Sequence, residues 1–202
     1  MGFFKIISRG TGLKRLFIGG VHGKEGLTTI KSLKSIREGD VPNGCLVIYN
    51  CDKSKYISTL NPLYYDSDTG KEVLYLINHY KPDMYIELHC YKPENFYDLT
   101  NLDRKKKTGV PPLIELEKGV LIGSVSPIIR TTVFKKEDIC ITLELPCTAP
   151  EESLVVYNNF LRILAGAKSR DDLERKTRKI YPEQVETSQK YAHEIFGDYP
   201  PF

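Results

Sequence analysis

Short apolar segments alternate with helical patterns through the first half of the 202-residue chain. Each apolar segment is rich in β-branched and aromatic residues and is bounded by glycine, proline or charge, which is typical of buried strands. Between them, residues 27–36 and 73–80 carry apolar side chains at helical spacing, and these patterns stop at Gly39 and before Pro82. This alternation predicts an α/β protein in which a largely parallel or mixed sheet is sandwiched by helices. The expected strands are Phe3–Ile7, Arg15–Gly19, Cys45–Asn50, Met84–Leu88, Val120–Val125, Ile128–Phe134 and Ile139–Leu145.

The pattern becomes helical from about residue 150. Pro150, followed by two glutamates, suits the first turn of a helix. A second helix is expected to begin after Ser169, and a third to span 182–196 before Gly197. We therefore predict a single domain over residues 1–202 with a helical C-terminal portion. These helices either pack on the sheet or form a contact in a homo-oligomer.

Charge and hydropathy exclude several classes of protein. The net charge of +3 divides into 29 basic and 26 acidic residues, which is too balanced to favour nucleic acid as a partner. The one basic run, residues 104–107, is interpreted as a solvated loop. The N-terminal sequence does not have the pattern of a signal peptide, and no apolar stretch approaches the length of about 20 residues that spans a bilayer. We therefore expect a cytoplasmic protein without a membrane partner.

The five cysteines form an odd set without CxxC spacing. In a reducing compartment such cysteines are most simply free thiols, and several lie in expected strands, where cysteine acts as a small buried hydrophobe. A zinc site built from cysteines is therefore disfavoured. The cysteines are Cys45, Cys51, Cys90, Cys140 and Cys147.

The segment GGVHGKEG, residues 19–26, joins an apolar strand to a helical pattern. Its His22 and Glu25 would lie on the turn at the C-terminal end of a strand, the edge of an α/β sheet where ligands bind. Imidazole and carboxylate are the usual ligands of catalytic zinc, and the surrounding glycines allow the backbone to approach an ion or substrate closely. Taken alone, the pair is equally compatible with a helix-capping glutamate and an incidental histidine.

Two later strands add polar residues at the same edge. The segment MYIEL delivers His89 at its end, which would complete a His₂Glu set with an open position, the arrangement of a catalytic zinc site. The segment ITLELP carries Glu144, and an acidic residue on an apolar strand is costly unless it is used or paired. We interpret Glu144 as a general base; the alternative is a carboxylate in a salt bridge.

Together these three motifs resemble the succinylglutamate desuccinylase/aspartoacylase branch of the zinc carboxypeptidase superfamily. GGVHGKEG is similar to its GGxHGxE signature, PDMYIELHCY to its D-x-H strand with Glu87 in place of the aspartate, and ITLELP to the strand of its catalytic glutamate. The resemblance implies a phosphorylase/hydrolase-like, zinc-carboxypeptidase-like core. It also implies one Zn²⁺ and hydrolysis of an amide next to a carboxylate. The chain is most similar to an uncharacterised archaeal group of this superfamily.

The residues that bind substrate are less clearly indicated. The branch has an asparagine and arginines between the first two motifs, but no arginine lies between Arg37 and Arg104 here. Arg130, expected on a strand, is the preferred anchor for a carboxylate, because only an arginine offers a bidentate fork. The chain also lacks the branch's additional C-terminal β domain, which would leave the active site open or completed by an oligomer. The candidate substrate-binding residues are Arg130, Asn50, Lys53, Lys55 and Tyr91.

Two functions remain open from the sequence. The first is a zinc-dependent hydrolase that cleaves an amide bond in a small molecule or peptide bearing a carboxylate, with His22, Glu25 and His89 as ligands and Glu144 as base. The second is a non-catalytic metal-binding or assembly protein that retains the fold. The missing arginines motivate the second function, whereas Glu144 favours the first, since a binding module needs no base.

Overall fold

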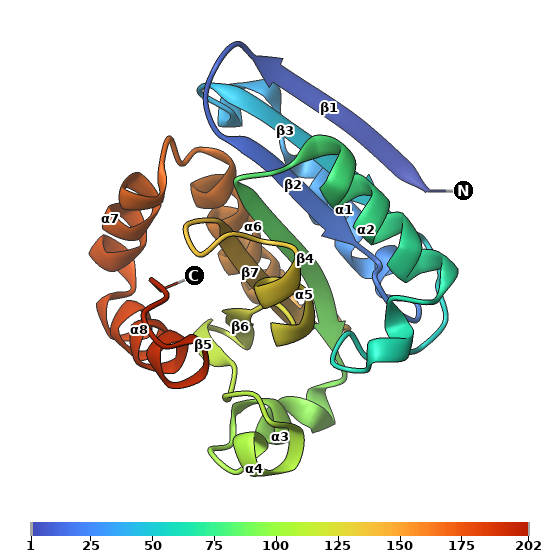
Figure 1. Ribbon diagram of the computed structural model, residues 1–202, viewed down its shortest axis with the longest axis vertical. Coiled ribbons are helices and arrows are strands. Elements are labelled where there is room, and N and C mark those ends of the chain that lie inside the picture. Colours follow the sequence, from blue (N-terminus) through green and yellow to red (C-terminus); the bar gives the residue numbers. More distant parts are fainter. Residues whose placement is uncertain (1, 202) are drawn as a thin grey trace.

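A computed structural model describes residues 2–201, and within them seven strands form one mixed sheet. The strand order across the sheet is β1-β3-β2-β4-β7-β6-β5. The predicted α/β class and mixed sheet are thus confirmed (Figure 1). The strands are β1 (Phe3–Arg9), β2 (Lys14–Gly19), β3 (Gly44–Asn50), β4 (Met84–Tyr91), β5 (Ile114–Glu117), β6 (Val120–Ser124) and β7 (Ile139–Pro146).

The four central strands β3, β2, β4 and β7 run parallel, while β1, β6 and β5 are antiparallel to their neighbours. Because these strands run in the same direction, their C-terminal ends all lie at one edge of the sheet, and crossover connections join them. In the β4–β7 pair the register places His89 directly opposite Glu144. The polar residues at the ends of the expected strands therefore meet at one edge.

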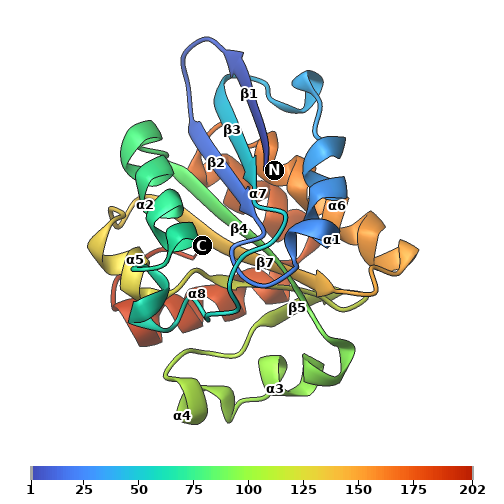
Figure 2. The same cartoon turned by 90° about the vertical axis from the view of Figure 1, so that its right-hand side faces the viewer.

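Helices cover both faces of the sheet. Figure 2 shows α2 and α5 on one side of the strands and α1 and α6 on the other. Within the described residues, none of these helices is long and apolar enough to cross a membrane. The helices are α1 (Gly26–Ser35), α2 (Asp68–Tyr80), α3 (Phe96–Thr100), α4 (Arg104–Thr108), α5 (Pro127–Thr132), α6 (Glu151–Ala165), α7 (Arg170–Ile180) and α8 (Pro182–Phe196), with short 3-10 turns at Glu38–Asp40, Pro62–Tyr64 and Pro93–Asn95.

Alternation along the strands divides the buried side chains into two cores. On β2, Phe17 faces the core covered by α1, α6 and α7, whereas Leu16 and Ile18 face the core covered by α2 and α5. Each is at most 1% exposed, and burying a side chain of this size is worth about 1.5–3 kcal/mol. The helices after residue 150 belong to the first core, through residues such as Leu161 and Val185. These helices therefore pack on the sheet, which is one of the two arrangements expected from the sequence.

The segment Ile128–Phe134 is not a strand as predicted. Residues 127–132 form helix α5 instead, because Ser126 caps it by accepting a hydrogen bond from the N–H of Ile128 (3.3 Å) and Pro127 occupies the first turn. Its β-branched residues suggested a strand, but local capping and burial of Ile129 against the sheet outweigh that preference. The short strand β5 was not expected from the sequence.

A buried arginine ties three parts of the fold together. Arg15, on β2, is only 1% exposed. Its Nη1 donates to the carbonyls of Leu13 and Asn43, both at 2.9 Å, and its Nη2 donates to the carbonyl of Ala167. The guanidinium therefore satisfies carbonyls near β2, before β3 and after α6 at once, which offsets the cost of burying its charge.

Arg15→Ala should lower the free energy of unfolding by about 3–5 kcal/mol, because it leaves several buried carbonyls without a donor. Denaturant unfolding followed by circular dichroism measures this change. Arg9→Ala on exposed β1 is the matched control, with an expected change within about 0.5 kcal/mol. Equal stability of the two variants would show that the Arg15 network contributes nothing net.

Candidate active site

The glycine turn after β2 is held against the segment that follows β3. Gly20 has φ +73°, and a Cβ atom there would lie 1.8 Å from the carbonyl oxygen of Cys51. A Cβ on Gly26 would meet the same oxygen at 1.8 Å. Only glycine permits this approach, so the glycines that flank His22 and Glu25 are a packing requirement of the turn.

Asn50 supports this turn from below. Its Nδ2 donates to the carbonyl of Gly26 (3.2 Å), and its Oδ1 accepts from the hydroxyl of Thr29 (3.0 Å). Asn50 is fully buried, at 0% exposure. The structure thus places this predicted substrate-binding residue beneath the turn, with its amide engaged by the protein.

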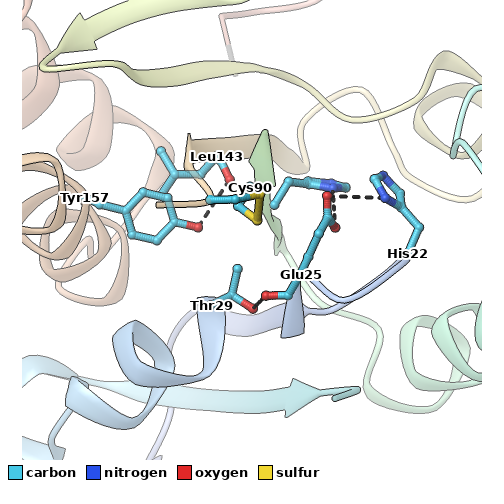
Figure 3. The surroundings of a disulfide bond; sticks show 8 residues. His22, Glu25, Thr29, Cys90, Leu143 and Tyr157 are labelled. Atoms are coloured by element: carbon cyan, nitrogen blue, oxygen red, sulfur yellow. Dashed lines mark hydrogen bonds and ion pairs between the residues drawn. A yellow bond between two sulfur atoms is a disulfide. The ribbon is translucent and has the colours of Figure 1, made fainter. Parts of the chain in front are cut away.

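Three side chains from two elements converge at the sheet edge. Nδ1 of His22 lies 3.3 Å from Oε1 of Glu25, and Nδ1 of His89 lies 3.3 Å from Oε2 of the same carboxylate. One ligand atom from each residue lies within 4.8 Å of the other two, a grouping that could hold a metal ion. Figure 3 shows the carboxylate of Glu25 directed toward His22. The residues predicted as metal ligands are therefore brought together.

The donor atoms themselves fit a cation. Nδ1 of His22, Oε2 of Glu25 and Nδ1 of His89 are buried, and apart from the 3.3 Å ion-pair contacts with one another none has a hydrogen-bond partner among the described residues. Buried polar atoms are nearly always satisfied, so three orphans facing a common point need an explanation. Two imidazole nitrogens and a carboxylate oxygen form the donor set that suits a divalent metal such as zinc.

A buried carboxylate fixes the orientation of His89. Nε2 of His89 lies 3.2 Å from Oε2 of Glu87, and Oε1 of Glu87 accepts from the hydroxyl of Tyr85 (2.8 Å). A carboxylate that accepts a hydrogen bond from Nε2 leaves the lone pair of Nδ1 available for a metal and raises the basicity of Nδ1. Metal-binding histidines usually have such a partner. The sequence motif indicated the position of Glu87 but not this bond.

The pKa values of the two histidines are shifted in opposite directions. Burial, and then the nearby His89, lower the pKa of His22, which keeps it neutral. Burial also opposes a charge on His89, but Glu25 and Glu87 outweigh it and raise the pKa of His89 well above its ordinary value. A cation bound by Glu25 and the two rings would displace the proton from His89, since a ligating imidazole is neutral.

Glu144 projects from β7 opposite His89 and is only partly exposed. Burial raises the pKa of its carboxyl, while His89 and Arg104 lower it in part. A carboxyl with a raised pKa takes up and releases a proton closer to neutral pH, which a general base requires. The hydroxyl of Tyr157 on α6 donates to the carbonyl of the preceding Leu143 (3.3 Å; Figure 3) and holds this part of β7 in place.

One large cavity, of about 1140 Å³, is lined by His22, Glu25, His89 and Glu144. Its remaining walls come from the segments after β3 and β4, from the stretch before β5, and from α8. This volume is slightly above the range of about 300–1,000 Å³ that is usual for small-molecule sites, so the cavity could hold a small molecule or a short peptide. Lys53 also lines the cavity, whereas Lys55 is exposed and contributes a backbone carbonyl to the N–H of Gly23 (3.4 Å).

Two other predicted substrate-binding residues, Tyr91 and Arg130, form hydrogen bonds to the backbone of the protein itself. The hydroxyl of Tyr91 donates to the carbonyl of Gly119 (2.6 Å), which attaches the β5–β6 turn to the end of β4. Arg130 lies on α5, not on a strand, and is 2% exposed. Its two terminal nitrogens donate to the carbonyls of residues 135, 136 and 138 at 2.7–3.0 Å, and its guanidinium stacks over Tyr199. It borders the cavity but is occupied by these contacts.

Sequence reasoning missed Arg104. The basic run was interpreted as a solvated loop, and its three lysines are exposed, but the run forms helix α4 and its first residue lines the cavity. Burial lowers the pKa of Arg104, and the charge of Glu144 partly restores it. A run of four basic residues does not reveal which of them faces the cavity, because this depends on how α4 packs against the rest of the protein.

Two of the five cysteines are not free thiols as expected. Cys90 and Cys147 form a disulfide with Cα atoms 4.9 Å apart (Figure 3), and the bridge joins the ends of β4 and β7. The other cysteines are free, and Cys140 is buried. The 57-residue separation concealed the pair, which becomes evident only once the two strands are known to be neighbours.

Breaking this bridge with Cys147→Ser should lower the free energy of unfolding by about 4 kcal/mol in the chain-entropy model, because the unfolded chain regains the freedom of a 57-residue loop. Thiol titration in denaturant without reductant should count Cys45, Cys51 and Cys140 only. Cys51→Ser is the control for stability. Titration of all five thiols in freshly purified protein would contradict the bridge.

Fold and site together define an α/β protein with a His-Glu-His group, able to hold a metal, at the C-terminal edge of its parallel strands. The chain belongs to a family conserved in archaea: residues 10–197 match the family described as "Uncharacterized protein conserved in archaea (DUF2119)". An uncharacterised protein from Methanocaldococcus jannaschii is 43% identical over 189 residues, which cover 91% of this chain and 92% of that protein. The predicted archaeal group is thus confirmed.

Several solved structures are similar at low identity. They include an aspartoacylase family protein from Mesorhizobium loti (TM-score 0.49, 15% identity, 83% of this chain and 62% of that one) and a metallo-carboxypeptidase from Pseudomonas aeruginosa (0.45, 14%, 84% and 61%). A succinylglutamate desuccinylase/aspartoacylase from Rhodobacter sphaeroides has a TM-score of 0.46 at 14% identity and covers 82% of this chain and 57% of that one. The chain spans about three fifths of the length of these structures.

Proposed function

We propose that this protein is a zinc-dependent hydrolase that cleaves an amide bond in a peptide or an N-acyl-amino acid. The observation that carries the proposal is the convergence of three buried metal-ligating atoms, none with a hydrogen-bond partner among the described residues, beside a partly buried glutamate in one large cavity. Neither feature is useful to a purely structural protein, since each costs stability.

Each residue then has a distinct task. His22, Glu25 and His89 would hold the ion, and Glu87 would keep the imidazole of His89 turned toward it. A zinc ion bound there supplies Lewis-acid polarisation of the scissile carbonyl and activation of water. Glu144 accepts the proton of the attacking water and gives it to the leaving amine, so that the carboxylate is regenerated when the C–N bond has broken.

The alternative is a non-catalytic metal-binding or assembly protein. Such a protein would use the His-Glu-His group but has no need for a carboxyl with a raised pKa on the same cavity. The placement of Glu144 opposite His89 therefore favours hydrolysis over binding alone.

His22→Ala and His89→Ala should each abolish the binding of one zinc ion per chain, because each removes one of three donor atoms. Elemental analysis after zinc loading and gel filtration measures this. His79→Ala and His193→Ala are matched controls, since both histidines are exposed on helices, and should keep the ion. A wild-type protein without stoichiometric metal after loading would overturn the proposed metal site.

Glu144→Gln should retain zinc but lower kcat by on the order of 10²- to 10⁴-fold, because the near-isosteric amide cannot accept a proton. Turnover of a substrate found by screening N-acyl-amino acids and short peptides measures kcat, and elemental analysis measures zinc. A variant that hydrolyses this substrate at the wild-type rate would remove Glu144 from the mechanism. Loss of zinc would make it a ligand instead.

A further inference from the structure

The cavity is much larger than its polar end requires. Besides His22, Glu25 and His89, the cavity is lined by the apolar residues of segment 110–114 and by side chains of α8, including Ala192 and Ile195. Only a bulky apolar group would displace water from such a wall with a gain in free energy, at about 25 cal/mol per Å² of apolar surface buried. A substrate with only small polar groups would leave it wet.

Arg104 lies where this wall meets the catalytic residues. Its Nη1 donates to the carbonyl of Pro111, while its Nε and Nη2 have no hydrogen-bond partner among residues 2–201. These two nitrogens form one edge of the planar guanidinium, the edge that can donate two parallel hydrogen bonds to a carboxylate. Arg130, by contrast, already uses both terminal nitrogens on backbone carbonyls.

Two polar contacts link α8 to the helix of Arg104 and to β5. Next to Arg104 on α4, the ammonium of Lys105 pairs with Glu194 on α8 at 2.9 Å. On the other end of α8, Nε2 of Gln184 donates to the carbonyl of Glu115 on β5 (3.2 Å). A guanidinium already bonded to a backbone carbonyl through Nη1 loses less freedom when it binds an anion than one that is free in solvent.

We propose that this site selects an amide substrate with two features: a carboxylate gripped by the free edge of Arg104, and a bulky aromatic or long aliphatic group lying between segment 110–114 and α8. The inference rests on the proposed hydrolase function and names its substrate class. Arg104 acts in it as a specificity-determining residue. A neutral or cationic group in place of the carboxylate would lose the attraction of the positively charged Arg104, which lines the same cavity as Glu144.

Binding tests this without requiring turnover. Zinc-loaded Glu144→Gln protein would be titrated calorimetrically with N-acylglycines whose acyl group is acetyl, decanoyl or benzoyl, each as the free acid and as the carboxamide. The parent should bind the decanoyl and benzoyl acids most tightly. Adding Arg104→Ala should weaken binding of these acids about 10- to 100-fold and of the carboxamides less than about 3-fold, because only the acids use the fork.

Further variants separate the two features. Ala192→Trp should weaken binding of the decanoyl and benzoyl acids about 10-fold and leave the acetyl acid unchanged, because it narrows the apolar wall only. Arg104→Lys should restore part of the acid preference through its point charge, and it replaces Arg104→Ala as the test if that variant does not fold. Lys106→Ala, an exposed lysine of the same helix paired with Asp103, is the charge control and should bind like the parent.

The outcomes distinguish this inference from the proposed function. Equal weakening of acids and carboxamides by Arg104→Ala, or a parent that binds the acetyl acid as tightly as the benzoyl acid, would overturn the substrate class. Hydrolysis of acylglycines by wild type, with no effect of Arg104→Ala on KM, would leave the hydrolase intact and refute the role of Arg104. Selective binding without hydrolysis of any substrate would support the recognition site while contradicting hydrolysis.

Discussion

Backbone hydrogen bonds between β4 and β7 determine the position of the candidate active site. They set His89 opposite Glu144, and the parallel pairing of β4 with β2 brings the glycine turn, with His22 and Glu25, to the same edge. A shift of one residue in either register would send one of these side chains into the opposite face of the sheet, since successive side chains alternate. The apolar residues that flank each polar one therefore have a second role: by filling two well-packed cores, they exclude the shifted registers and hold the polar groups within reach of one another.

The site also concentrates charge where the protein interior tolerates it least. Glu25, Glu87 and His89 are each less than 10% exposed, and Arg15 is buried at the other end of β2. Arg15 is stabilised by backbone carbonyls, whereas Glu87 is stabilised by the hydroxyl of Tyr85 and by the ring of His89. Buried charges persist only when such partners are present, and in the metal-binding group the partners remain incomplete. Arg15 and Glu87 are bonded to groups of the fold itself, whereas Nδ1 of His22, Oε2 of Glu25 and Nδ1 of His89 have no hydrogen-bond partner among the described residues.

Most of the fold and the centre of the site could be predicted from the sequence, because they depend on local patterns. The strand that carries His89, the glycine turn around His22 and helix α8 can each be recognised from a short continuous stretch of sequence. The features that were missed depend on contacts between distant segments. The Cys90–Cys147 bridge needs the pairing of β4 with β7, and the inward turn of Arg104 needs the seating of α4 against Pro111. Arg130 was misplaced because its β-branched neighbours have strand preferences that Ser126 and Pro127 override.

The cavity wall formed by α8 has a consequence for the order in which the site is assembled. His22, Glu25, His89 and Glu144 all precede residue 150, whereas α8 begins at Pro182. As the chain leaves the ribosome, the sheet and its polar edge emerge before the helix that encloses them. During that interval an ion can reach the half-built edge directly from solvent, without passing through the finished cavity. On the proposed function, enclosure by the final helix would separate the binding of a metal during synthesis from the selection of a substrate afterwards.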